Sequence, residues 1–299
     1  MKCAAVDIGT NTILLVIAQK NGETFTDIAD VSTIVRLGEG LVRSGSLKKE
    51  AISRTIDGLR NYLDIAASHG VEKILCVGTE ALRKAKNGNE FVAQVKDAFG
   101  LDIEIISGRD EAYYTYLSVR NDALIAQADM TIVDIGGGST EIINAACGRF
   151  AGHVSLPIGS VVLTDAYVSH DPPEAGELRN VSSFIRKNLE NVSLSPGIVL
   201  VGTAGTVTNI AALILGIRQY DKSRIHGFTI RMQDLEGLIT SLASLTSAAR
   251  KDIPGMEAGR EDIIVQGAMI LKEVMIHGNF DACIVSAAGV RYGLLYERF

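Results

Sequence analysis

One stretch of the chain, 132–141 (IVDIGGGSTE), combines residue types that suit a metal-bound phosphate. Its glycines allow the backbone N–H groups to approach a bulky anion, and its hydroxyls are further donors. Its two ends carry carboxylates, Asp134 and Glu141, and carboxylate oxygens are ligands that Mg²⁺ prefers. The candidate phosphate contacts of this stretch are Gly136, Gly137, Gly138, Ser139 and Thr140. A plain hairpin with a flexible glycine turn has the same short pattern, so the stretch alone leaves both interpretations open.

A second copy of the pattern lies near the N-terminus. Val-Asp-Ile-Gly occurs at residues 6–9 and again at 133–136, nearly half the chain away. Each copy follows an apolar strand-like run and leads through Ser or Thr into another such run, which indicates a duplicated strand–turn–strand unit. Two such hairpins facing each other would hold a phosphate from both sides. The second hairpin adds Asp7 as a candidate metal ligand and, as candidate phosphate contacts, Gly9, Thr10, Asn11 and Thr12.

A third glycine-containing turn, 202–206 (GTAGT), leads into a predicted helix. The free N–H groups and the dipole at a helix N-terminus attract anions. None of the three turns has the Gly-Lys-Ser/Thr ending of a P-loop or the Rossmann spacing, so their recurrence is what points to phosphate. The candidate contacts in this turn are Gly202, Thr203, Gly205 and Thr206.

Three charged residues could complete the chemistry. Ser107 and Asp110 fit a helix-capping pattern. Glu111 is not explained by that pattern and could be a general base that takes a proton from an attacking water. It could equally be a surface residue favoured by the helix dipole. Arg83 and Arg291 carry planar forks of donors that suit phosphate oxygens, but each could also belong to an ordinary helix.

The elements that position these residues alternate between strands and helices, which predicts an α/β class with mixed sheets. Apolar, β-branched runs predict strands at 2–8, 13–20, 25–35, 73–77, 103–106, 131–134, 141–146, 152–156, 198–201 and 282–286. Helical spacing of apolar residues predicts helices at 51–67, 89–99, 159–168, 174–190, 206–215, 261–277 and 290–299. Thr79 is predicted to cap a short helix through Arg83, and Ser107 to start another. Gly293 could allow close packing of the last helix.

Composition narrows the class of protein. With 299 residues, 47% of them hydrophobic, the chain can bury a large core and is expected to form two domains. No apolar run reaches the roughly 18 residues of a membrane helix, and no signal-peptide pattern opens the chain, so we expect a cytoplasmic protein without a membrane partner. Its net charge of −6 argues against nucleic acid as a partner. The four widely spaced cysteines are expected to be buried, reduced thiols.

A set of motifs, taken in order, resembles the exopolyphosphatase/guanosine pentaphosphate phosphohydrolase (Ppx/GppA) family of the acetate and sugar kinase, Hsp70 and actin superfamily. The motifs lie at 5–12, 79–83, 107–112, 134–141, 156–160, 202–206 and 226–227, so that the resemblance spans nearly the whole chain. It implies two duplicated ribonuclease-H-like (actin-like ATPase) domains, 1–125 and 126–289, with mixed sheets flanked by helices and the active site in the interdomain cleft. It further implies that the closing helix from about 290 packs on the first domain, that Mg²⁺ or Mn²⁺ is the cofactor, and that the protein is a homodimer.

The resemblance also implies roles for single residues. Glu111 matches the glutamate proposed as the family's catalytic base, and Asp134 and Glu141 match acidic residues at its metal and phosphate site. The three glycine turns match its phosphate loops, and Arg83 and Arg291 match arginines in its motifs.

The chain departs from the family pattern in three places. Asp110 stands where many members have a second glutamate, a change that a capping role tolerates. Residues 286–288 read Ser-Ala-Ala where many relatives have an acidic residue. The chain also ends near residue 299, without the C-terminal helical domains with which long members bind long polyphosphate, so processive degradation is in doubt.

The favoured function is metal-dependent hydrolysis of the terminal phosphoanhydride of inorganic polyphosphate, with release of orthophosphate. The alternative is hydrolysis of the 5′ phosphate of pppGpp, and no residue in the sequence decides between these substrates. Two further alternatives are a small-molecule kinase of the same superfamily and a sensor that binds (p)ppGpp without turnover.

Overall fold

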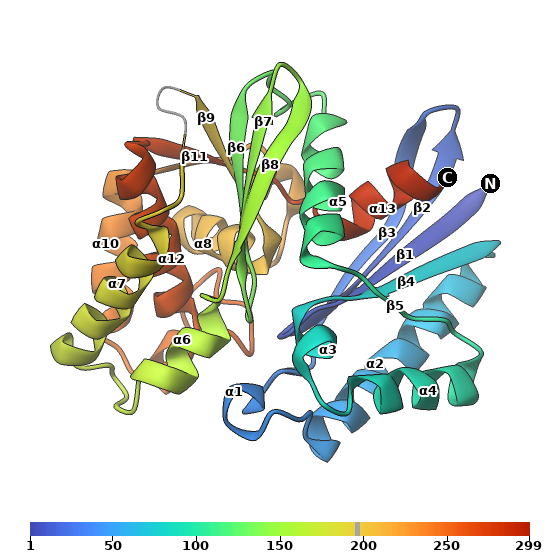
Figure 1. Ribbon diagram of the computed structural model, residues 1–299, viewed down its shortest axis with the longest axis horizontal. Helices are drawn as coiled ribbons and strands as arrows, with labels where there is room; N and C mark the ends of the chain where they lie inside the picture. The colour runs from blue at the N-terminus through green and yellow to red at the C-terminus, as the bar shows by residue number, and fades with distance from the viewer. Residues whose placement is uncertain (195–197) are drawn as a thin grey trace. The chain divides into compact units, whose positions relative to one another are not determined.

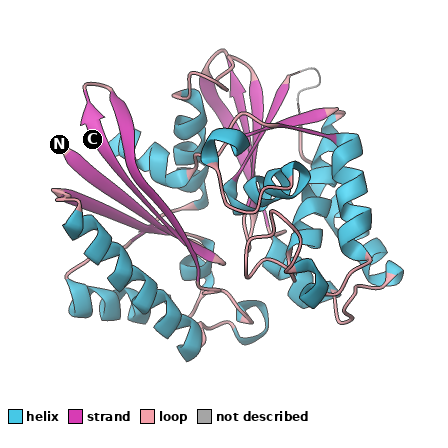
Figure 2. Cartoon of the chain, turned by 180° about the vertical axis from the view of Figure 1, so that it is seen from behind, coloured by secondary structure: helices cyan, strands magenta, loops and turns pink. Residues whose placement is uncertain are grey.

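The computed structural model describes residues 1–194 and 198–299 and divides the chain into two compact units. Unit 1 comprises Met1–Ser118 and Gly289–Phe299, and unit 2 comprises Val119–Ala288. Each unit has one mixed sheet with helices packed against it (Figures 1 and 2). The predicted α/β class with mixed sheets is therefore confirmed.

The sheet of unit 1 has the strand order β3-β2-β1-β4-β5, with β1 antiparallel to β2 and parallel to β4. Its strands are β1 Lys2–Ile8, β2 Thr12–Asn21, β3 Thr24–Ile34, β4 Lys73–Gly78 and β5 Glu104–Ile105. Its helices are α1 Leu41–Ser44, α2 Lys49–Ser68, α3 Glu80–Lys84, α4 Gly88–Phe99, α5 Gly108–Arg120 (whose end passes into unit 2) and α13 Val290–Arg298.

The core of unit 1 follows from the alternation of side chains along β1. Ala4, Val6 and Ile8 point to one face, where they join a buried cluster with Leu59 of α2 and Phe91 of α4. Helix α13 packs against β1 and β2, on the other side of the sheet from α2 and α4 (Figure 1). The chain therefore needs its last residues to cover the second face of its first sheet.

Close packing of α13 depends on one glycine. A methyl group added at Gly293 would lie 1.7 Å from the carbonyl oxygen of Tyr114 in α5. Only a residue without a side chain allows two backbones to approach this closely, so the packing role predicted for Gly293 is confirmed.

The sheet of unit 2 repeats the arrangement of unit 1. Its order is β10-β11-β9-β6-β7-β8, with β6 antiparallel to β7 and parallel to β9. Its strands are β6 Met130–Ile135, β7 Thr140–Ala146, β8 Arg149–Leu156, β9 Val199–Thr203, β10 Thr229–Arg231 and β11 Ala282–Val285. Its helices are α6 Ser160–Tyr167, α7 Ala175–Leu189, α8 Ala204–Leu215, α9 Lys222–Ile225, α10 Met232–Ala243, α11 Ser247–Arg250 and α12 Ile264–Gly278.

Helix α12 is the centre of the unit 2 core. It packs against α6, α7, α8 and α10, and most of its residues are buried, as expected of a helix that is apolar all round. Its one buried carboxylate, Glu273, accepts hydrogen bonds from Ser182 and from Arg186 Nε, the latter at 2.8 Å. The charge is thus compensated inside the unit.

Some sequence expectations were wrong. Thr79 precedes α3, but its hydroxyl donates to the Ile8 carbonyl at 3.3 Å instead of capping the helix. Helix α12 begins at Ile264 rather than at 261, because the Glu261 carboxylate accepts from the Gly259 N–H at 2.6 Å and belongs to a turn. Cys147 is exposed rather than buried, since it occupies the β7–β8 turn with a φ of 51°. The short elements α1, α9 and β10 were not predicted, whereas α10 and α11 agree with the expectation that the chain from Gln233 on is mostly helical.

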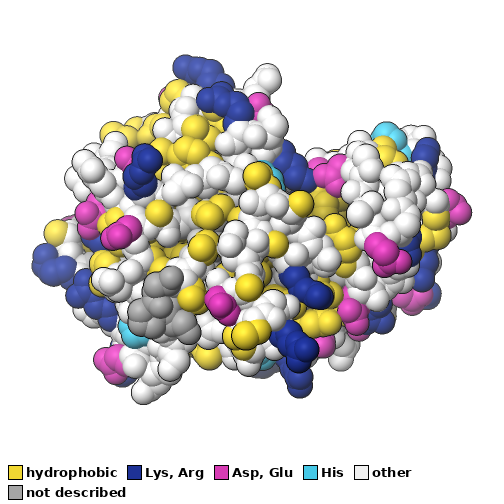
Figure 3. All heavy atoms as spheres, turned by 90° about the horizontal axis from the view of Figure 1, so that it is seen from above, with side chains coloured by type: hydrophobic (Ala, Val, Ile, Leu, Met, Phe, Trp, Pro, Cys, Tyr) yellow, Lys and Arg dark blue, Asp and Glu magenta, His cyan; other side chains and the backbone are white. Residues whose placement is uncertain are grey.

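The surface carries charges of both signs. On the face drawn in Figure 3, Lys and Arg side chains are interspersed with Asp and Glu. Across residues 1–194 and 198–299, no helix has the length and apolar character needed to cross a membrane.

Candidate active site

The β6–β7 hairpin of unit 2 brings the two predicted carboxylates together. Asp134 is paired directly with Glu141 in the antiparallel ladder, and Ile135 with Thr140. The Gly136 N–H donates to the Ser139 carbonyl at 3.0 Å and closes the turn. Residues opposite each other in such a ladder project their side chains on the same face of the sheet. The carboxylates at the two ends of the stretch are therefore neighbours in space.

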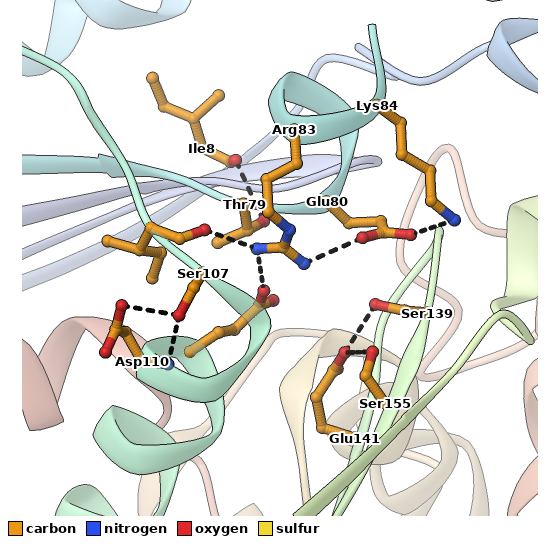
Figure 4. Close-up of polar contacts among 12 residues, drawn as sticks. Ile8, Thr79, Glu80, Arg83, Lys84, Ser107, Asp110, Ser139, Glu141 and Ser155 are labelled. Carbon is orange, nitrogen blue, oxygen red and sulfur yellow. Dashed lines mark hydrogen bonds and ion pairs between the residues drawn. The ribbon is translucent and has the colours of Figure 1, made fainter.

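Glu141 is held by hydroxyl groups. Its Oε1 atom accepts from Ser139 Oγ at 2.8 Å and from Ser155 Oγ at 2.9 Å (Figure 4). Glu141 is 2% exposed and Asp134 is 8% exposed. Two hydrogen bonds to one oxygen fix the orientation of the Glu141 carboxylate.

The carbonyls of the glycine turn face helix α6. Gly136 O accepts from the Ser160 N–H and Gly137 O from the Val161 N–H, each at 3.0 Å. A methyl group at Gly159 would lie 2.3 Å from Gly137 O, so only glycine lets α6 begin here. These contacts satisfy the first N–H groups of α6 and anchor the turn.

The amides of the same turn are differently placed. In the described part of the chain, neither the Gly137 N–H nor the Gly138 N–H donates to a backbone carbonyl. They are thus available as donors to an anion. Thr140, also predicted as a phosphate contact, is fully buried, and its hydroxyl donates to Ile158 O at 2.6 Å.

The third predicted loop joins β9 to α8. Thr203 is the N-cap residue of α8, but its hydroxyl donates to the Ala288 carbonyl and does not cap the helix. Ala204 has a φ of 70°, a left-handed conformation that is strained for a residue with a side chain. Strain and an uncapped N-terminus at one turn are typical of a binding loop, which is what the sequence predicts here.

Arg260 is a neighbour of this loop that the sequence did not indicate. A methyl group at Gly205 would lie 2.0 Å from Arg260 Nη2, so the guanidinium lies directly over this glycine. Arg260 is 5% exposed and its Nε donates to Glu257. Nothing in the local pattern connects residues so far apart in the chain, and only the fold brings them together.

The β1–β2 hairpin of unit 1 has the same closure. The Gly9 N–H donates to Thr12 O at 3.0 Å. The Asn11 carbonyl accepts from the Arg36 N–H at 2.8 Å, and the Thr10 carbonyl accepts from Gly38, also at 2.8 Å. The side-chain amide oxygen of Asn11 is buried and has no hydrogen-bond partner among the described residues. It is an acceptor that suits a metal-bound water.

Arg83 of α3 and Glu111 of α5 are also brought together within unit 1. Arg83 Nη1 donates to Glu111 Oε2 at 2.6 Å and to the Ile106 carbonyl at 3.0 Å. Burial would lower the pKa of Arg83, but the charges and hydrogen bonds of Glu111 and Glu80 outweigh it and raise that pKa. Arg83 is therefore a permanent cation, and Glu111 is 8% exposed.

Ser107 and Asp110 have the predicted capping role. Ser107 Oγ accepts from the Asp110 N–H at 3.2 Å and donates to the Asp110 carboxylate at 2.7 Å. The two neighbouring acids therefore have different roles: Asp110 caps the start of α5, whereas Glu111 contacts Arg83.

Arg291 lies elsewhere in unit 1. It stands on α13, is 6% exposed, and its Nη2 donates to Asp30 Oδ1 of β3 at 2.6 Å. Its neighbour Tyr292 donates to Asp27 Oδ2 at 2.7 Å. Both contacts fasten α13 to the edge of the sheet.

The residues fit a hydrated Mg²⁺ ion better than a closed metal cage. No group of three or more His, Cys, Asp or Glu residues that could hold a metal occurs in the ranges the structure describes. Magnesium, however, usually keeps several waters and needs only one or two carboxylates. Asp134 and Glu141, neighbours in the ladder beside the glycine turn, satisfy this requirement.

Comparisons with known proteins agree with the geometry. The family model described as the Ppx/GppA phosphatase family matches residues 16–299. Exopolyphosphatase 2 of Mycobacterium tuberculosis is 33% identical over 91% of this chain and 89% of its own length. The crystal structure of the Aquifex aeolicus family member superimposes with a TM-score of 0.84 at 32% identity, covering 99% of this chain and 97% of that one. An exopolyphosphatase from Cytophaga hutchinsonii, at 24% identity, shares the fold with a TM-score of 0.89, covering 99% of this chain and 97% of its own. The family resemblance drawn from the motifs is confirmed: the chain belongs to the Ppx/GppA phosphatase family and is a phosphatase.

Proposed function

We propose that this phosphatase hydrolyses the terminal phosphoanhydride of inorganic polyphosphate and releases orthophosphate. The observation that carries the proposal is the pairing of Asp134 with Glu141 beside a glycine turn whose amides can donate to an anion. The M. tuberculosis relative, an exopolyphosphatase, supports the class of substrate.

Unit 2 supplies most of the phosphate contacts in this proposal. The N–H groups of Gly137 and Gly138, the Ser139 hydroxyl and the N-terminus of α8 bind the oxygens of the terminal phosphoryl group. Asp134 and Glu141 would hold Mg²⁺ or Mn²⁺ in unit 2, and Asp7, the matching carboxylate in the hairpin of unit 1, is a further candidate metal ligand. A bound metal would supply positive charge that offsets the negative charge on the phosphoryl oxygens.

Unit 1 supplies the proton acceptor. Glu111 orients a water molecule and takes its proton as the water oxygen bonds to phosphorus. The bond from phosphorus to the bridging oxygen breaks, and the shortened polyphosphate leaves with the electron pair. Arg83 keeps the Glu111 carboxylate in place, and its fixed positive charge makes it a candidate phosphate contact. Positioning and electrostatics carry most of the rate, as in phosphoryl transfer generally.

The first experiment compares two neighbouring carboxylates. Glu111→Gln should keep the fold and lose roughly 10²–10⁴-fold in kcat if Glu111 is the general base. Asp110→Asn is the matched control, because Asp110 caps the helix, and we expect its kcat within about 5-fold of the wild type. Phosphate release from polyphosphate by the Glu111→Gln variant at nearly the wild-type rate would remove Glu111 from this role.

A second candidate substrate is pppGpp, since the matching family description covers both enzyme types. The kcat/KM values of the wild type for pppGpp and for polyphosphates of several lengths would rank the two. ADP formation that requires an added acceptor would instead indicate a kinase. Tight binding of (p)ppGpp without phosphate release under Mg²⁺ or Mn²⁺ would indicate a sensor.

A further inference from the structure

Glu80 is a half-buried acid beside the proposed catalytic groups. It is the first residue of α3, and its side chain is 13% exposed. One carboxylate oxygen, Oε2, accepts from Arg83 Nη2 at 2.9 Å, and the other, Oε1, accepts from Lys84 Nζ at 2.6 Å. Figure 4 shows the three side chains side by side. Glu80 therefore uses both oxygens on cations of its own helix.

Arg83 in turn divides its two amino groups between two acids. Nη2 donates to Glu80, whereas Nη1 donates to Glu111 at 2.6 Å and to the Ile106 carbonyl at 3.0 Å. A planar guanidinium that is held at both amino groups cannot rotate about its long axis. The orientation in which Arg83 presents Nη1 to Glu111 thus depends on the contact with Glu80.

On an exposed helix, an ion pair such as Glu80–Arg83 would do little to fix the position of either side chain. Ion pairs three residues apart on exposed helices are weak, because water screens them and both side chains lose freedom. Here the Arg83 and Glu80 side chains are only 19% and 13% exposed, so screening is weaker. Helix α3 has five residues, too few to hold a long side chain in place by its own backbone order.

We propose that Glu80 is a positioning residue for phosphoanhydride hydrolysis: it fixes the guanidinium of Arg83, and through it the Glu111 carboxylate, in the orientation that water activation needs. This inference rests on the proposed function. It assigns Glu80 no contact with substrate, so its effect belongs in kcat, and the affinity for polyphosphate should change little.

The test is a pair of substitutions at one position. Glu80→Ala removes both oxygens, and we expect kcat to fall about 10- to 100-fold, as for other residues that orient a catalytic group, with KM within about 2-fold. Glu80→Gln keeps an oxygen that can accept from Arg83 Nη2, so it should recover most of the lost kcat. Glu90→Ala is the control, since Glu90 is an exposed acid in the first turn of α4 in the same unit. Its kcat should equal that of the wild type.

Four outcomes would count against the inference. A Glu80→Ala variant with a kcat within 2-fold of wild type would overturn the inference. So would a lower KM with a higher kcat/KM, because that result would mean that Glu80 competes with phosphate for Arg83. Thermal unfolding of each variant shows whether a loss of kcat is a loss of fold. If Glu80→Ala is unfolded, a Glu80→Gln variant with a wild-type melting temperature whose kcat falls about 10-fold or more would also count against positioning, because its oxygen can still accept from Arg83. If the wild-type chain releases no phosphate from polyphosphate, the proposed function fails and takes this inference with it.

Discussion

The two hairpins share one backbone frame but hold different side chains. In both, the amide of the first turn residue donates to the carbonyl three residues on, at 3.0 Å in each case. Asp7 and Asp134 occupy the same place near the end of the first strand. Opposite Asp7 the second strand has Leu14, whereas opposite Asp134 it has Glu141. Only the hairpin of unit 2 therefore has a pair of carboxylates.

The helices α3 and α8, which follow the parallel strands β4 and β9, also differ, but here unit 1 has the charged side chains. Each begins after a threonine, Thr79 before α3 and Thr203 before α8, and in neither case does the threonine cap the helix. The fourth residue of α3 is Arg83, which contacts Glu111, whereas the fourth residue of α8 is Val207, fully buried in the core. Unit 1 supplies charged side chains at this helix and unit 2 supplies backbone donors. The two units thus have the same backbone arrangement but offer different chemical groups at the equivalent helix.

The largest effect should come from making the two hairpins alike. Glu141→Gln removes one of the paired carboxylates but keeps the size of the side chain, and we expect kcat to fall roughly 10²–10⁴-fold through loss of electrostatic stabilisation. Leu14→Gln places the same residue at the matching position of unit 1 and should cost no more than about 5-fold. Steady-state release of phosphate from polyphosphate measures both. Equal losses in the two variants would mean that the hairpins do not differ as described.

The next effect concerns what supports each turn. A methyl group at Gly159 would lie 2.3 Å from the backbone oxygen of Gly137, whereas one at Gly38 would lie 2.3 Å from a methyl group of Thr10. Backbone cannot move aside as a side chain can, so Gly159→Ala should lower stability by about 1–3 kcal/mol and Gly38→Ala by less. We expect the KM for polyphosphate to rise about 10-fold in Gly159→Ala, because the displaced turn carries the phosphate donors. Calorimetry would measure the two losses of stability, and steady-state kinetics would measure the KM values. A loss of stability in Gly159→Ala no greater than that in Gly38→Ala would contradict the prediction.

The hairpins were predictable because their signals are local. β1 and β6 are short apolar runs that are buried almost without interruption, and glycines follow each of them, so strand, turn and strand are defined without reference to the rest of the chain. The antiparallel hairpin that this turn closes explains why Asp134 and Glu141, at the two ends of the stretch, become neighbours. Strand β10 escaped prediction since it has three residues, of which only Ile230 is buried, too few to show a period.

The contacts around the hairpins were not predictable in the same way. Arg83 meets Glu111 across 28 positions of sequence, and Arg260 lies over Gly205 from a distant turn. Such pairs depend on how helices return to the sheet, which no local pattern records. The motif resemblance indicated that Arg83 and Glu111 matter, but not that Glu80 holds Arg83.

A smaller effect distinguishes a half-buried hydrogen bond from histidine to aspartate in unit 2 from an exposed ion pair in unit 1. In unit 2, Asp122 accepts from His226 and from the Leu124 N–H, each at 2.9 Å. Burial alone would raise the pKa of Asp122, but these hydrogen bonds outweigh it and lower that pKa. In unit 1, Glu39 pairs with Lys48 at 2.8 Å, and the hydrogen bond from Lys48 lowers the pKa of Glu39.

Both carboxylates stabilise the fold above their unfolded pKa values, near 4, and this stabilisation is lost as the pH falls through the lower folded values. Asp122→Asn should therefore lower the melting temperature at pH 7 by about 3 °C and by progressively less as the pH falls from 5 towards 2. Glu39→Gln should cost no more than about 1 °C, because the Glu39 side chain is 42% exposed and salt screens it. Melting curves with and without 1 M NaCl would test the contrast. The prediction would be contradicted if 1 M NaCl removed the decrease in melting temperature caused by Asp122→Asn. It would also be contradicted if Glu39→Gln lowered the melting temperature more than Asp122→Asn does.

The smallest predicted effect concerns the reactivity of the cysteine thiols, which can be changed without loss of phosphatase activity. Burial raises the pKa of the Cys76 thiol in β4 of unit 1, and it raises the pKa of Cys283 in β11 of unit 2 to about 12. Cys147, in the β7–β8 turn, is exposed. Because the thiolate is the reactive form, a thiol reagent at pH 8 should label one cysteine rapidly, and peptide mapping should place it at Cys147. Cys147→Ser should abolish the rapid phase and leave phosphate release unchanged. Rapid labelling of Cys76 would mean that the sheet of unit 1 opens in solution. Units 1 and 2 would then differ in local stability as well as in the side chains of their hairpins.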